Sequence, residues 1–297
     1  MPLLAWGLLL ALSGLWGGSF LFNRVAVAEI PMLGVVSGRI VLASLVLLAI
    51  SRLSGVALPR DRTSWRDFAV MGLLNNIVPF CLIVWGQKTI GAGLASIFNA
   101  TTPIFGVIVA HVFTVDDKIT PARALGIALA FAGVVVLVGV DALGGLGDHL
   151  LAELACLGAA VSYGFSALWS RRFRGRPPVV TATGQLVCSS VMLAPAVLLL
   201  DPPWTHAAPG LPAIASVLAL AVLSTAVAYV LFFRLNTMVG PTNTILVTFL
   251  IPPSAILLGV LVLGERLAPQ HVAGVILIGL GLAAVDGRLP RRLGLAT

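Results

Sequence analysis

Apolar residues run through the chain in long stretches, which short polar or proline-containing segments separate. A membrane-spanning helix needs about 20 predominantly apolar residues, and ten such stretches can be placed end to end. Prolines mark several of the breaks, at helix starts or in loops. The expected spans are 3–22, 31–51, 67–86, 91–114, 122–140, 150–170, 179–200, 213–233, 241–263 and 271–287. The pattern predicts an all-α membrane protein with ten transmembrane helices.

Composition supports the membrane class. Of the 297 residues, 59% are hydrophobic and 10% are charged, whereas soluble domains carry roughly 25% charged residues. No segment is long enough for a separate soluble domain. The three cysteines, Cys81, Cys156 and Cys188, lie within apolar runs. They are expected to fill buried space rather than form disulfides.

The positions of the cations predict the orientation. With the N-terminus placed in the cytoplasm, the outer loops hold Arg24, Lys88 and Arg266, and Arg39 lies within a span. The other 14 cations fall on the inner side: Arg52, Arg60, Arg62, Arg66, Lys118, Arg123, Arg171, Arg172, Arg174, Arg176, Arg234, Arg288, Arg291 and Arg292. Lys and Arg accumulate in cytoplasmic loops, so both termini are expected there, in a multi-pass protein of the cell inner membrane. This distribution also argues against nucleic acid as a partner, despite the net charge of +7.

The first span is expected to be retained. No cation precedes the apolar run at 3–22, and this run is long for a cleaved signal peptide.

The two halves of the chain resemble each other at a shift of 147–149 residues. The matched pairs are Gly17 with Gly164, Ser19 with Ser166, Arg24 with Arg171, Pro31 with Pro178, Gly91 with Gly240, Pro103 with Pro252, Pro121 with Pro269 and Gly126 with Gly274. The expected units are therefore 1–146 and 147–297, each with five helices. Because five is odd, the second unit must enter the membrane from the opposite side, which makes an inverted-topology repeat. In secondary transporters such repeats meet around a site near the midplane.

Several short motifs along the chain point to a family. They are Trp16-Gly17, Arg39, the segment ending at Pro103, Leu250-Ile251-Pro252, Gly264-Glu265 and Gly274. With the five-plus-five plan, they resemble the drug/metabolite transporter superfamily, specifically its EamA-type members. The resemblance implies export of amino acids, drugs or other small metabolites. Asp117 departs from it, since a glutamate matching Glu265 is expected there.

Prolines inside the spans mark places where the helical backbone is interrupted. Pro103 and Pro252 cannot donate an N–H, and so they free the carbonyls of Asn99 and Thr248, four residues earlier. Pro79 has the same effect on Asn75. Broken backbone at membrane depth is tolerated only against protein or a wet cavity. A substrate cavity is favoured here over a structural kink.

Polar and aromatic residues at matched positions supply further candidates for substrate binding. They are Asn75, Asn76 and Phe80 in the third span, Ser224, Thr225 and Tyr229 in the eighth, Trp16 in the first, and Tyr163 and Ser166 in the sixth. Asn76 and Phe80, four residues apart, are expected on one helix face. The alternative is hydrogen bonding between helices. Ser13, Trp16, Phe20 and Asn23 form a stripe at helical spacing, which is more typical of packing.

Arg39 is a charge within a span, and such residues are usually functional. No carboxylate lies at a similar depth in the expected spans, so two roles stay open: a structural one, and contact with a substrate carboxylate. The same scarcity of buried acids leaves proton coupling and facilitated diffusion open.

The sequence therefore predicts a secondary transporter that exports amino acids or related metabolites by alternating access. A multidrug or other metabolite exporter is the main alternative. An intramembrane enzyme is disfavoured, because no zinc-protease, nucleophile-elbow or phosphate-loop motif is present. No cofactor or metal is expected. The partners are a small-molecule substrate and the lipid bilayer. The substrate's identity and the oligomeric state stay open.

Overall fold

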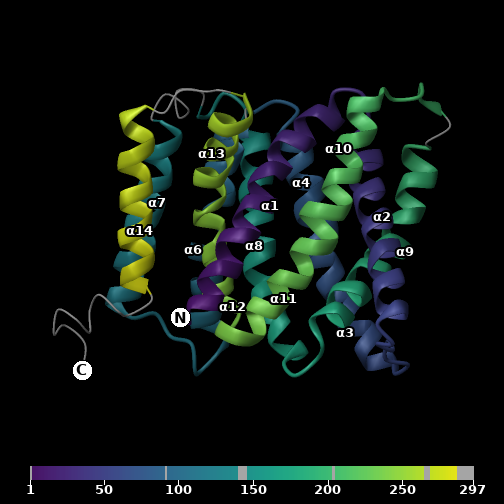
Figure 1. Cartoon of the computed structure of the whole chain (residues 1–297), viewed down its shortest axis with the longest axis horizontal. Coiled ribbons are helices and arrows are strands. Elements are labelled where there is room, and N and C mark those ends of the chain that lie inside the picture. Colours follow the sequence, from purple (N-terminus) through teal and green to yellow (C-terminus); the bar gives the residue numbers. More distant parts are fainter. Residues whose placement is uncertain (1, 91, 140–145, 203–204, 264–267, 286–297) are drawn as a thin grey trace.

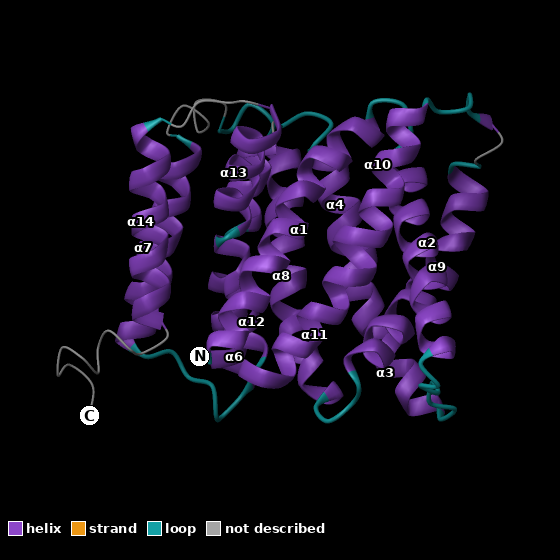
Figure 2. Cartoon of the chain, in the orientation of Figure 1, coloured by secondary structure: helices purple, strands orange, loops and turns teal. Residues whose placement is uncertain are grey.

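The computed structural model describes residues 2–90, 92–139, 146–202, 205–263 and 268–285. In these ranges the chain consists of helices and connecting loops, without a strand. Figure 2 shows the helices packed side by side as one bundle. The predicted all-α fold is confirmed for this part of the chain.

The helices continue one another across several short irregular turns. In chain order they are α1 (Leu3–Val27), α2 (Met32–Leu53), α3 (Arg62–Gly72), η1 (Leu73–Ile77), α4 (Val78–Gly86), α5 (Ala92–Asn99), α6 (Thr102–Phe113), α7 (Pro121–Val138), α8 (Leu150–Ser170), η3 (Arg171–Phe173), α9 (Pro178–Leu200), α10 (Leu211–Ala221), η5 (Val222–Val227), α11 (Ala228–Val239), α12 (Pro241–Thr244), η6 (Ile245–Phe249), α13 (Ile251–Leu263) and α14 (Pro269–Val285). The turns η1 and η5 are π-helical, and η3 and η6 are 3-10 turns.

Nine helical stretches of the described chain are long and apolar enough to cross a membrane. They coincide with the first nine expected spans, although the third begins earlier, at Arg62, and the eighth continues to Val239. The remaining apolar helix, α14, has 17 residues. Its length of about 26 Å is slightly less than the ~30 Å thickness of the hydrocarbon core.

The helices stand roughly parallel between two edges of the bundle (Figure 1). α1 begins and α14 ends at the lower edge of this view. The stretch α3–α4 runs from the lower edge to the upper one, whereas α10–α11 runs from the upper edge to the lower one. Some residues named from the sequence lie outside the described residues: Gly91, Gly264, Glu265, Arg266, Arg288, Arg291 and Arg292.

A π-helical turn interrupts the third helical stretch of the first half. The N–H of Val78 donates to the carbonyl of Leu73, five residues earlier, instead of to that of Leu74. The carbonyl of Leu74 accepts the hydroxyl of Ser162, on α8, at 2.7 Å. A buried carbonyl needs such a partner. The first half is therefore tied to the second through a backbone group that the π turn releases.

Pro79 releases a second carbonyl in the same turn. It has no N–H, and the Tyr229 hydroxyl, on α11, lies 3.2 Å from the carbonyl oxygen of Asn75. Both donors to this turn come from the second half of the chain.

The matching stretch of the second half repeats the arrangement. In η5 the N–H of Ala228 points to the carbonyls of Leu223 and Thr225. The carbonyl of Ser224 accepts hydrogen bonds from side chains of the first half: the indole N–H of Trp16, at 3.1 Å, and Nη2 of Arg39, at 3.3 Å. π turns in the two halves thus place side chains of the opposite half at the centre of the bundle.

The expected interruptions at Pro103 and Pro252 are also present. The helix breaks between α5 and α6, and the carbonyl of Asn99 accepts the Thr102 hydroxyl at 2.7 Å instead of a backbone N–H. In the second half the 3-10 turn η6 precedes Pro252. Each interrupted helix therefore brings irregular backbone to the middle of the bundle.

α7 and α14 pack closely along glycines. A Cβ atom added to Gly281 would lie 2.5 Å from the backbone nitrogen of Ala130 and 2.5 Å from the carbonyl oxygen of Gly126. One added to Gly274 would overlap Cβ of Leu137. Small residues let helix backbones approach each other in membranes, and these glycines allow the α7–α14 contact.

We expect Gly281→Ala to destabilise the protein by about 1–3 kcal/mol, because the new methyl group must push backbone atoms of α7 aside. Gly279→Ala is the matched control on α14, since a Cβ atom there meets nothing within 4 Å. Thermal unfolding of the purified protein in detergent measures both. Equal unfolding temperatures for the two variants would contradict the tight α7–α14 contact.

Candidate functional site

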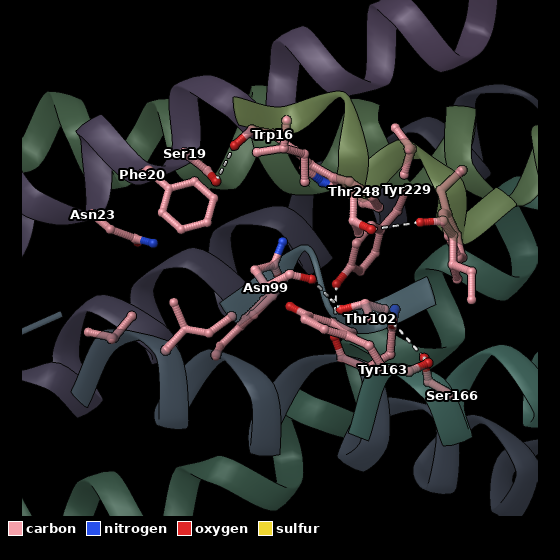
Figure 3. A pocket seen from close by; sticks show the side chains of 18 of the residues that line it. Trp16, Ser19, Phe20, Asn23, Asn99, Thr102, Tyr163, Ser166, Tyr229 and Thr248 are labelled. Atoms are coloured by element: carbon pink, nitrogen blue, oxygen red, sulfur yellow. Dashed lines mark hydrogen bonds between the residues drawn. The ribbon is translucent and has the colours of Figure 1, made fainter. Parts of the chain in front are cut away.

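A cavity lies among helices of both halves (Figure 3). The space between its lining atoms, including the part that is open to solvent, is about 740 Å³. The lining residues are Trp16, Ser19, Phe20, Asn23, Arg39, Asn75, Phe80, Ile83, Val84, Asn99, Thr102, Tyr163, Ser166, Tyr229, Phe232, Ile245, Val247, Thr248 and Ile251. The cavity therefore draws on the interrupted segments of both halves.

Many of the residues that the sequence selected meet at this cavity. Those in its wall are Trp16, Arg39, Asn75, Phe80, Asn99, Tyr163, Ser166, Tyr229 and Thr248. Five others are not in the wall: Asn76, Pro103, Ser224, Thr225 and Pro252. The two prolines directly follow Thr102 and Ile251, which do line the cavity.

Three polar side chains of the wall have no hydrogen-bond partner among the described residues: Asn23, Asn99 and Tyr163. Asn23 is 4% exposed and Asn99 is 6% exposed. Figure 3 shows both amides and the Tyr163 ring around the same space. Buried polar groups normally have partners, so a ligand or water in the cavity is expected to provide them.

Arg39 brings a positive charge to the same wall. Its Nε donates to the Thr225 hydroxyl at 2.6 Å, and its Cζ lies 3.9 Å from the ring centre of Phe80. The ion pairs of the described chain do not include Arg39. The guanidinium is thus held by neutral groups, and its charge is uncompensated.

Aromatic rings form the apolar part of the wall. The centres of the Trp16 and Phe232 rings lie 5.7 Å apart, and the indole N–H is fixed on the Ser224 carbonyl. Phe20 and Phe80 also line the cavity. A ligand here would contact a flat apolar surface on one side and amides on another.

Asn76 belongs to a network between helices rather than to the wall. It is fully buried, its Nδ2 donates to the Ser189 hydroxyl at 2.8 Å, and its Oδ1 accepts the Tyr229 hydroxyl at 2.6 Å. Asn75 does line the cavity, and its Oδ1 accepts the Ser166 hydroxyl at 3.1 Å. For Asn76 the structure favours hydrogen bonding between helices, the alternative that the sequence left open.

Ser224 and Thr225 are likewise fully buried. The Ser224 hydroxyl donates to the carbonyl of Leu15 at 2.8 Å, while Thr225 accepts from Arg39. Both residues fix the positions of Trp16 and Arg39 in the cavity wall without lining the cavity themselves.

Sequence reasoning did not select ten lining residues: Ser19, Phe20, Asn23, Ile83, Val84, Thr102, Phe232, Ile245, Val247 and Ile251. Phe20 and Asn23 belong to the stripe that was assigned to packing. Asn23, the polar end of that stripe, could have been selected as a candidate, because an amide deep in an apolar helix needs a hydrogen-bond partner. Thr102 could have been found from its place before Pro103.

At the lower edge of the bundle, a cluster of charges joins the two halves around Asp117. Its carboxylate accepts Nη1 of Arg123 at 2.6 Å, Nη2 of Arg171 at 3.0 Å and the hydroxyl of Thr242. Arg171 also binds Asp116 at 2.7 Å. Arg171 and Thr242 belong to the second half, so the Asp117 cluster connects the halves away from the cavity.

Two segments of the chain, residues 3–139 and 150–285, match the model of the EamA-like transporter family. The chain belongs to this family. The expected resemblance to EamA-type transporters is thereby confirmed.

Several relatives of this EamA-like protein carry transporter names. It is 28% identical over 274 residues to a "probable terminal-alkyne amino-acid exporter" of Streptantibioticus cattleyicolor, covering 91% of this chain and 88% of that one. It is 22% identical over 273 residues to the uncharacterized transporter YoaV of Bacillus subtilis, covering 90% and 91%. It is 25% identical over 283 residues to the uncharacterized inner membrane transporter YedA of Escherichia coli K12, covering 93% and 90%.

A solved crystal structure has the same fold. It superimposes on the EamA-like protein with a TM-score of 0.77 at 20% identity, covering 97% of this chain and 99% of the other.

We expect Tyr229→Phe to destabilise the EamA-like protein by about 0.6–1.7 kcal/mol, the range for hydrogen bonds between membrane helices. The change leaves two buried acceptors, on Asn75 and Asn76, without their donor. Tyr163→Phe is the control, because the Tyr163 hydroxyl has no hydrogen-bond partner in the described chain. Tyr229→Phe should have a lower unfolding temperature than Tyr163→Phe. An unfolding temperature of Tyr229→Phe equal to that of the wild type would show that the network does not contribute to stability.

Asp117 gives the stability of the protein a pH dependence. Burial of its carboxyl group raises the pKa, but the hydrogen bond from Thr242 and the guanidinium groups of Arg123 and Arg171 outweigh burial, so the pKa lies below its ordinary value. A carboxyl group with a lowered pKa stabilises the fold above its unfolded-state pKa, and this contribution is lost as the pH falls through the folded-state pKa.

We therefore expect Asp117→Asn to lower the unfolding temperature at pH 7, by an equivalent of about 1 kcal/mol after allowance for solvent screening. The difference from wild type should shrink as the pH approaches about 3. Asp148→Asn is the control, since the Asp148 side chain is exposed and has no hydrogen-bond or ion-pair partner among the described residues. A difference that stays constant between these pH values would contradict the assignment.

Proposed function

We propose that this EamA-like protein is a secondary transporter that exports amino acids or related small metabolites across the cell inner membrane. The observation that carries the proposal is the composition of the cavity. It combines the unpaired amides of Asn23 and Asn99, the free hydroxyl of Tyr163 and the uncompensated charge of Arg39 with an aromatic wall.

This composition suits a zwitterion with an apolar side chain. A carboxylate would meet Arg39, whose charge has no carboxylate partner among the described residues, and guanidinium groups bind carboxylates well. A hydrogen-bond donor elsewhere on the substrate would find the side-chain oxygen Oδ1 of Asn23, an acceptor without a donor. The apolar side chain would lie against Trp16 and Phe80.

The proposed topology has ten membrane spans in two inverted five-helix units, 1–146 and 147–297, with both termini in the cytoplasm. The opposite directions of α3–α4 and α10–α11 support it (Figure 1), as do the two matches to the family model. The lower edge is then the cytoplasmic side, because it carries the loops with most of the cations.

Alternating access would proceed by rocking one unit against the other around the cavity. The Asp117 cluster joins the units at the proposed cytoplasmic edge. Opening the cavity to the cytoplasm would then require the cluster to separate. The amino-acid exporter of Streptantibioticus cattleyicolor supports the substrate class.

The experiment is uptake of labelled amino acids into liposomes that contain the purified protein, with and without a pH gradient. We expect saturable uptake that unlabelled amino acids inhibit. Tyr163→Phe and Asn99→Ala should raise KM about fivefold, the equivalent of one hydrogen bond of ~1 kcal/mol, without changing the unfolding temperature.

Asn243→Ala serves as the control, because Asn243 lies outside the cavity and its Nδ2 donates to the carbonyl of Val239. If a folded sample takes up no amino acid but does take up other metabolites or drugs, the amino-acid assignment is wrong and the transporter assignment stands. Equal KM values for all three variants and the wild type would show that the cavity is not part of the transport path.

A further inference from the structure

A second, smaller cavity lies at the lower edge of the bundle, where α8 and α11 end and α9 begins. The space between its lining atoms, including the part that is open to solvent, is about 290 Å³. Arg171, Arg174, Arg176, Thr181 and Asn236 contribute polar groups to its wall. None of them lines the central cavity.

Three arginines contribute positive charge at this cavity. Arg171 is neutralised by Asp116 and Asp117. Arg176 donates to the hydroxyl of Ser64 at 2.8 Å, and this hydroxyl donates in turn to the carboxylate of Asp61 at 2.8 Å, so Asp61 offsets part of the Arg176 charge. The side chain of Arg174 has no polar partner among the described residues. Arg174 therefore brings an uncompensated guanidinium group to this cavity, and Arg176 adds a partly compensated one.

Thr181 provides a second, independent observation. It is 1% exposed, lines this cavity, and its hydroxyl has no hydrogen-bond partner in the described chain. A buried hydroxyl normally has one. Thr181 lies in the first turn of α9, so the positive end of the helix dipole faces the same region.

We propose that this cavity binds a phosphate group. Arg174 and Arg176 would pair with its charged oxygens, as guanidinium groups do in bidentate contacts, and Thr181 would donate to a third oxygen. A basic pocket between membrane helices on the cytoplasmic side suits the headgroup of an anionic lipid. Free phosphate offers the same chemistry, and the experiment separates these two sources.

The experiment is thermal unfolding of the full-length protein in detergent, titrated with phosphatidylglycerol, with phosphatidylcholine, or with inorganic phosphate against chloride at equal ionic strength. The variants are Arg174→Gln, Thr181→Val and, as the control, Arg234→Gln. Arg234 is an exposed cation of α11 that does not line the cavity. Unfolding without added lipid or phosphate checks that each variant folds.

We expect phosphatidylglycerol to stabilise the protein at lower concentration than phosphatidylcholine does. The half-saturating concentration should rise about fivefold in Arg174→Gln, the size expected for one cation at a membrane surface. It should also rise about fivefold in Thr181→Val, the equivalent of one hydrogen bond of ~1 kcal/mol, and less than twofold in Arg234→Gln. Stabilisation by inorganic phosphate with the same variant pattern would support the site with free phosphate as its ligand.

Two outcomes would overturn the proposal. In one, Arg174→Gln and Arg234→Gln weaken lipid binding equally and Thr181→Val has no effect, which is the pattern of general surface charge. In the other, neither phosphatidylglycerol nor inorganic phosphate stabilises the wild-type protein more than its comparison compound does.

Discussion

A backbone carbonyl inside a lipid bilayer must find a hydrogen-bond donor within the protein, because no water is present to serve. The centre of this EamA-like protein is organised around carbonyls that its own helices release. In the π turns the N–H groups of Val78 and Ala228 donate elsewhere than to the carbonyls of Leu74 and Ser224, four residues earlier, and Pro79 has no N–H to donate to that of Asn75. In each case a side chain of the opposite half donates to the carbonyl. Ser162 donates to that of Leu74, Trp16 and Arg39 donate to that of Ser224, and Tyr229 donates to that of Asn75. The same interruptions that weaken single helices therefore hold the two halves together.

This constraint also separates two kinds of polar residue at the centre. Residues such as Asn76, Ser224 and Thr225 are fully buried, and their hydrogen bonds end within the protein. Asn23 and Asn99 have no such partners and face the cavity. Arg39 combines the two properties. Neutral groups of the protein fix its position, and its charge is available to a ligand in the cavity. Substrate recognition is then expected to depend on the unpaired groups, and the fixed groups determine the shape of the site.

Much of the fold could be predicted from the sequence, because long apolar stretches, prolines and matched positions are strong signals. The π turns could not, and this affected the site. With α-helical spacing, Asn76 was expected to share a face with Phe80. In the structure Asn75, five residues before Phe80, lines the cavity with it, as the wider π turn requires. Asn23 was missed for another reason: its importance follows from the absence of a partner, which only the packing of several helices determines.

The central claim is that the cavity between the halves is the transport path. It is tested most directly by replacing Asn99 with cysteine in a protein whose Cys81, Cys156 and Cys188 are replaced by alanine. The measurement is the rate at which a polar thiol reagent modifies Asn99→Cys in liposomes, with and without saturating substrate. The account predicts that a transported substrate slows the reaction, because it occupies the cavity. An unchanged rate, in a protein that still transports, would contradict it.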